Sequence, residues 1–120
     1  MSTRASVRII DENSKEEKWA YHHTNGHPEF LGLMIAIQLS KLRWDEWKVE
    51  NILKLLTEKE IQHPYMSYTT ILKPTCGAGD ESFVYSINCN LRTLTCYNHC
   101  FNEDYKTCMK RDRIEMFIRI

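Results

Sequence analysis

The sequence lacks a long apolar segment and an excess of charge of either sign. No apolar run approaches the roughly 18 residues needed to cross a bilayer, and the first residues lack the apolar core of a signal peptide. The 16 basic and 16 acidic residues cancel, whereas nonspecific nucleic-acid binding normally needs a basic surface. We therefore expect a cytoplasmic protein that neither enters a membrane nor binds nucleic acid nonspecifically.

Internal repeats and low-complexity segments are also absent. Hydrophobic residues make up 42% of the chain and charged residues 27%, which is typical of a globular protein and excludes a disordered one. A chain of 120 residues fits one domain. The five cysteines are odd in number, which favours reduced thiols in a cytosolic protein.

The first half of the chain predicts a hairpin followed by two helices. Residues 3–10 and 16–23 alternate in polarity and predict two antiparallel strands. A helical pattern then runs from Pro28 to about Leu42, with Glu29 in its first turn. A second helix is predicted from an N-cap at Asp45 to about Leu56.

The second half of the chain is rich in strands. β-Branched and aromatic residues at 65–73 favour a strand, and alternation predicts further strands at 83–89, 94–98 and 114–120. Residues 99–112 are polar and irregular in pattern. The order ββααββββ clusters the helices, which predicts one α+β domain with both helices packed on one face of a mainly antiparallel sheet.

The stretch from Trp19 to Gly32 holds three of the five histidines. His22 and His23 are adjacent on a strand and point to opposite faces. His22 and His27 could converge across the Asn25-Gly26 turn, with Glu29 as a third ligand to a metal, and His27 alone could act as an acid or base. The alternative is that backbone groups satisfy these histidines in a tight loop. The spacing matches no compact zinc pattern, so we expect no metal here.

A second candidate metal site combines Cys96, His99, Cys100 and Cys108. Zinc bound by these residues would stabilise a region that has little apolar material. The alternative is that Cys96 faces the core, as Cys89 does by its alternation. A disulfide between Cys100 and Cys108 would arise only by oxidation during purification. Because the spacing lacks paired C-x-x-C units, we predict no cofactor, with zinc as the alternative.

Two surfaces are candidates for binding another protein. The first helix is apolar nearly all round, so a second helix or a partner chain must cover the side that the sheet leaves. Val49, Ile52, Leu53 and Leu56 form the core stripe of the second helix. Trp47 falls opposite this stripe and is either an exposed interface anchor or, with Trp44, packed over a neighbouring loop. The predicted protein-binding residues are Asn25, His27, Glu29, Phe30, Trp44 and Trp47.

The start Met-Ser-Thr-Arg and the turn Asn25-Gly-His-Pro-Glu-Phe-Leu-Gly32 resemble a group of small proteins of phages and prophages. That group has a Met-Ser/Gly-Thr-Arg start and a Gly-Tyr-Pro-Glu-Gly loop before a helix. Here His27 stands in place of the usual Tyr and Phe30 in place of the usual Gly. The strand residues 83–89 and 94–97 are similar to the group's second hairpin. The resemblance implies a gene context and carries no established activity.

Two functional hypotheses follow. The first is a protein of a phage or mobile element that binds a host protein, in its sharpest form an inhibitor of a host defence factor such as an anti-CRISPR protein. Self-association into a homodimer would use the same surface. The second is a small metal-dependent or nucleotide-cleaving enzyme that uses the loop of His22 and His27. No nucleophile elbow, paired carboxylates or phosphate-binding loop is present, so we expect no enzyme.

Overall fold

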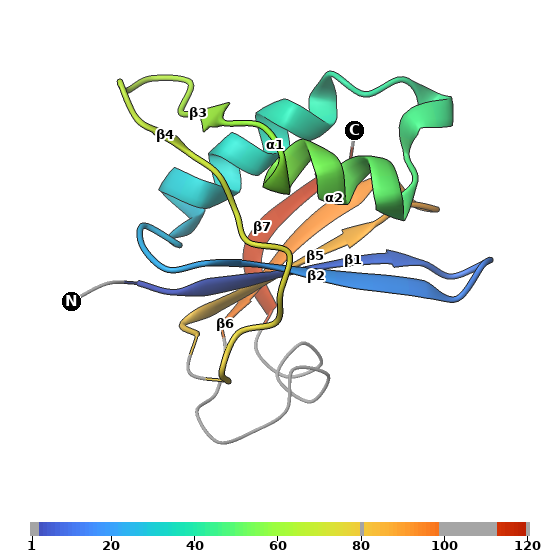
Figure 1. The fold of residues 1–120 in the computed structure, drawn as a ribbon, viewed down its shortest axis with the longest axis horizontal. Coiled ribbons are helices and arrows are strands. Elements are labelled where there is room, and N and C mark those ends of the chain that lie inside the picture. Colours follow the sequence, from blue (N-terminus) through green and yellow to red (C-terminus); the bar gives the residue numbers. More distant parts are fainter. Residues whose placement is uncertain (1–2, 80, 99–112, 120) are drawn as a thin grey trace.

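The computed structural model describes residues 3–79 and 81–98, and the backbone of residues 113–119. Five strands form one sheet in the order β2-β1-β5-β6-β7, and a separate two-stranded hairpin is formed by β3 and β4. Helices α1 and α2 lie together on one face of the five-stranded sheet (Figure 1). The elements are β1 (Ala5–Asp11), β2 (Glu16–His22), η1 (Pro28–Gly32), α1 (Leu33–Ser40), η2 (Trp44–Glu46), α2 (Val49–Thr57), β3 (Ile61–Gln62), β4 (Thr69–Thr70), β5 (Phe83–Asn88), β6 (Thr93–Asn98) and β7 (Arg113–Arg119).

The predicted α+β fold is confirmed. All pairings in the large sheet are antiparallel except that of β1 with β5, which is parallel. The register aligns Ala20, Val7, Tyr85 and Cys96 in one row across four strands. Residues directly opposite one another point to the same face of a sheet, and all four of these side chains are buried. They therefore lie on the face of the sheet that packs against the helices.

The predicted first helix is divided into two parts. A π-helical turn spans Pro28–Gly32, and α1 follows as a regular α-helix. Ile35 and Met34 are both fully buried, although the sequence places them on different sides of the helix. The sheet covers one side, and α2 with the β3–β4 hairpin covers the other (Figure 1). Met34 and Ile35 are therefore covered within the chain itself, whereas Leu33 is half-buried and Ile37 is 36% exposed.

The predicted second helix is also interrupted. A 3-10 turn at Trp44–Glu46 ends before α2, and Lys48 rather than Asp45 is the N-cap residue of α2. The Glu46 carboxylate accepts a hydrogen bond of 2.7 Å from the Arg43 backbone N–H, which closes the 3-10 turn as a separate unit. In the expected core stripe, Val49, Ile52 and Leu56 are buried as predicted, and Leu53 is partly buried against the same core.

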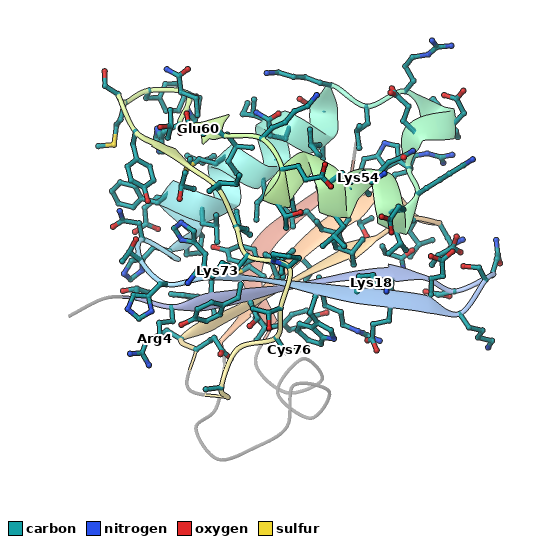
Figure 2. All side chains as sticks on the ribbon, viewed as in Figure 1. Arg4, Lys18, Lys54, Glu60, Lys73 and Cys76 are labelled. Carbon is teal, nitrogen blue, oxygen red and sulfur yellow. The ribbon has the colours of Figure 1, made fainter. Side chains whose placement is uncertain are left out.

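The segment 65–73 forms much less strand than its composition predicts. Only Thr69 and Thr70 pair regularly, with β3, and Lys73 makes a single bridge to Tyr21 at the edge of β2. β Propensity produces a strand only where a partner strand is available along its length. Instead the chain crosses the edge of β2 between Lys73 and Cys76 on its way to β5 (Figure 2). In the part of the chain that the structure describes, no helix is long and apolar enough to cross a membrane.

Candidate functional site

The turn after β2 is held against the start of β1. Asn25 has a left-handed backbone conformation, with φ of 52°, which Asn tolerates better than most residues. A Cβ atom on Gly26 would lie 2.8 Å from the Cβ of Ala5 and 2.9 Å from the carbonyl oxygen of Thr3, so no other residue fits without displacement. The Gly26 N–H donates a hydrogen bond of 2.9 Å to that oxygen. The turn is therefore fixed in position.

His22 points into the protein beneath the β3–β4 hairpin. It is 5% exposed, and its Nε2 lies 2.7 Å from the hydroxyl oxygen of Thr70. Its Nδ1 is buried without a hydrogen-bond partner among the described residues. Burial lowers the pKa of His22 below its ordinary value; the backbone of Thr24 acts in the opposite direction, and His23 lowers it further.

His27 has a different set of partners. Its Nε2 lies 2.9 Å from the hydroxyl oxygen of Thr3, and its ring meets the ring of Phe83 edge-on at 5.3 Å. The carboxylate of Glu29 is 4.0 Å from its Nδ1. His27 and Glu29 are thus close together, as predicted, whereas His22 bonds to another element. Within residues 3–79 and 81–98, no group of three or more potential ligands is arranged to hold a metal ion.

His63 is a central residue of this end of the molecule that the sequence did not single out. It is 5% exposed. Its Nδ1 accepts a hydrogen bond of 3.1 Å from the backbone N–H of Tyr65, so Nε2 carries the hydrogen and donates to the carbonyl oxygen of Glu29 at 3.0 Å. The ring packs between Phe30 at 5.6 Å and Tyr65 at 6.0 Å. His63 therefore attaches the β3–β4 hairpin to η1.

This attachment brings residues of two distant segments close together. Tyr65 and Met66, at the tip of the β3–β4 hairpin, are 83% and 51% exposed, and half-buried Phe30 adjoins them through His63. The predicted binding residues of the turn lie on the same end of the molecule. We call this the hairpin-tip surface; it comprises Asn25, His27, Glu29, Phe30, Tyr65 and Met66.

The interpretation of Trp47 as an exposed interface anchor is wrong. Trp47 is 6% exposed and belongs to the hydrophobic core. The helical pattern placed it opposite the core stripe, but Trp47 precedes α2 and has a non-helical backbone, with φ of −76° and ψ of 71°. The helical periodicity therefore does not apply to it. Trp44, in contrast, is 75% exposed.

Two of the three described cysteines are part of the core, and the third is exposed. Cys96 and Cys89 are buried in the core, which confirms the alternative in which Cys96 faces inward. Burial raises the pKa of Cys96 to about 12, although the adjacent Tyr85 hydroxyl acts in the opposite direction. Cys76 is exposed. The other three predicted zinc ligands, His99, Cys100 and Cys108, lie outside the described residues.

Known proteins offer no further guide to the function. No protein family, curated protein or solved structure matches this chain.

Proposed function

We propose that the protein acts by binding another protein through the hairpin-tip surface. The observation that carries the proposal is the exposure of Tyr65 and Met66 at a hairpin tip that His63 holds against Glu29 of the turn. Aromatic residues and Met are enriched at the centres of protein–protein interfaces. The polar residues of the turn lie beside these apolar side chains, as in an apolar centre with a polar rim.

The rigidity of this surface also favours binding. The hydrogen bonds of His63 to Glu29 and Tyr65, together with that of Gly26 to Thr3, fix both segments before a partner arrives. A pre-organised surface loses less conformational entropy when it binds. The surface can therefore bind tightly without a large contact area.

The proposed partner is a host protein. The most specific version of the proposal is that the chain inhibits a host defence factor, for example as an anti-CRISPR or other anti-defence protein. This version rests on the resemblance to small phage and prophage proteins. Binding alone is sufficient for such inhibition, because an inhibitor that covers a functional surface needs no chemistry of its own. The alternative, an enzyme, requires His22 and His27 to act at one site. Because His22 bonds to Thr70 and His27 to Thr3, the two histidines have different partners and do not support such a site.

The first experiment identifies the partner and tests the surface. Affinity-tagged protein is incubated with host lysate, the captured protein is identified, and its affinity is measured with both components purified. Light scattering of the protein alone is recorded beforehand, because a homodimer would occupy the same surface. We expect the double variant Tyr65→Ala/Met66→Ala to bind at least tenfold more weakly, since interface anchors commonly contribute 2 kcal/mol or more, about thirty-fold.

The matched control is Ile71→Ala, because Ile71 is similarly exposed, at 46%, but lies outside the hairpin-tip surface. The control should retain wild-type affinity, and all variants should have similar melting temperatures. Equal affinity of the double variant and the wild type would show that the partner binds elsewhere. A second assay expresses the protein in cells with an active defence nuclease. If these cells cut or exclude foreign DNA as well as cells without the protein do, the inhibitor role is rejected. The binding result would stand in that case.

A further inference from the structure

The opposite end of the molecule carries an exposed tryptophan stacked with an arginine. Trp44 begins η2 and is 75% exposed, and the guanidinium carbon of Arg92 lies 3.5 Å from the centroid of its ring. Arg92 belongs to the turn between β5 and β6. One face of the indole is therefore covered by a cation, while most of the remaining ring surface faces solvent.

The turn that presents Arg92 is rigid. Arg92 has a left-handed backbone conformation, with φ of 53°, and the side-chain oxygen of Asn88 accepts hydrogen bonds from the N–H groups of Asn90 and Leu91. The Asn90 side chain in turn donates to the carboxylate of Asp11, at the end of β1. These bonds join the two hairpin turns. Arg92 is thus held in a defined place next to Trp44.

The hydrogen-bond donors of Arg92 have no acceptor in the described chain. The guanidinium has five N–H donors, and Nε is buried without a hydrogen-bond partner among residues 3–79 and 81–98. Ion pairs in that range include those of Arg8 with Glu17, His27 with Glu29 and Arg43 with Asp45, and none of these three involves Arg92. No described carboxylate therefore neutralises the Arg92 cation. Because Nε is covered by the protein, an anionic group from outside would bind at the terminal N–H groups of the guanidinium.

We propose that Trp44 and Arg92 form a binding site for a carboxylate side chain in an acidic segment of a partner protein. The carboxylate accepts hydrogen bonds from the edge of the guanidinium, as planar carboxylates do, and the apolar atoms next to it lie on the indole. The nearby Arg43 is paired with Asp45, so the positive charge of the site comes from Arg92. This site is separate from the hairpin-tip surface and does not depend on it.

The charge distribution favours an acidic protein segment over a nucleic acid. The chain has no net charge, and the cations near Trp44 alternate with Asp45, Glu46 and Glu50 along the sequence. Binding a polyanion requires several phosphates to be neutralised by a continuous basic surface. One uncompensated guanidinium beside an exposed ring instead fits a single carboxylate with an apolar neighbour.

The test uses the full chain and three synthetic probes. The first is a short peptide in which Glu residues alternate with Phe and Leu, the second replaces each Glu with Gln, and the third is a single-stranded oligothymidylate. Binding is followed by NMR through the indole N–H signal of Trp44, assigned by its loss in Trp44→Phe. We expect the acidic peptide to shift this signal to saturation. The Gln peptide and the oligonucleotide should bind at least tenfold more weakly.

Two variants separate a binding role from a structural one. Arg92→Gln removes the charge and should weaken the acidic peptide at least tenfold, because hydrogen bonds to charged groups are worth roughly that factor or more. Arg92→Lys keeps the charge without the planar fork and should lie between Arg92→Gln and the wild type. The proposal is overturned if the acidic peptide causes no saturable shift, if both Arg92 variants bind it as the wild type does, or if the oligonucleotide binds more tightly.

Discussion

The hydroxyl group of Tyr85 donates a hydrogen bond of 2.7 Å to the carbonyl oxygen of Gly26, 59 residues earlier in the chain. Tyr85 lies in the centre of the sheet and is fully buried, whereas Gly26 belongs to the turn that leads into η1. This bond therefore connects the core directly to the hairpin-tip surface. Together with the bond of the Gly26 N–H to Thr3, it holds the turn in place.

Replacing Tyr85 with Phe should destabilise the protein by about 1–3 kcal/mol, because the carbonyl oxygen of Gly26 would stay buried without its donor. Urea unfolding followed by fluorescence measures the change. Tyr68→Phe is the matched control, since Tyr68 is half-buried against the same core and makes no comparable buried bond among the described residues. A Tyr85→Phe variant as stable as the control would mean that the bond contributes nothing.

Replacing Ile35 with Asp should abolish soluble folding. Ile35 is fully buried in α1, and an isolated buried charge costs on the order of 4 kcal/mol or more, a large part of a typical total stability of about 5–15 kcal/mol. Ile37→Asp is the control on the same helix, because Ile37 is 36% exposed; it should cost about 1 kcal/mol or less. Expression yield and circular dichroism distinguish the two. Similar behaviour of both variants would contradict the orientation of α1.

The two tryptophans of the 44–47 segment should respond differently to truncation. Trp47→Ala removes a large core side chain and should cost about 3–5 kcal/mol. Trp44→Ala removes an exposed ring and one cation–π contact, which is worth about 1 kcal/mol or less at an exposed site. Thermal unfolding of both variants measures the difference. If the Trp47→Ala variant has the melting temperature of the wild type, Trp47 is not part of the core.

His22 should make the protein less stable as the pH falls below about 6.5. Burial lowers its pKa from the ordinary value of 6.5, so the unfolded chain binds a proton more readily than the folded one. The free energy of unfolding therefore rises with pH through this range, and the contribution of neutral His22 to it is lost when the pH falls. We expect the stability difference between the wild type and His22→Gln to shrink or reverse between pH 8 and pH 5. Parallel stability curves for the two proteins would show that His22 does not contribute.

Thiol labelling should separate the described cysteines. Cys76 is exposed and should react with iodoacetamide in the native protein. Cys89 and Cys96 are buried, and burial raises their pKa values to about 11 and about 12, so they should react only after unfolding. Because Cys96 is enclosed in the core, we also expect it not to bind zinc. Stoichiometric zinc in protein purified without chelator, lost when Cys96 is replaced, would contradict this expectation.

The sequence by itself determined the features that depend on local periodicity. Alternation identified the buried face of β1 through Val7, and the helical spacing of Ile52 and Leu56 identified the buried side of α2. These predictions succeed because the side chains of a strand or a helix repeat at a fixed period, so the apolar positions report which side is covered. The turn at Asn25-Gly26 was predictable for a similar reason, since its backbone conformation is a local property of those residues.

Only the tertiary structure decided which distant segments meet. Trp47 was misplaced because a break of the helix between Glu46 and Val49 moved it out of the helical period and into the core. The packing of His63 against Glu29, and of Arg92 against Trp44, joins residues far apart in the chain. Periodicity shows which side of a helix or strand is buried, but it does not show which other element packs against that side. That choice depends on the shape of the whole core, which determines where each loop crosses the sheet.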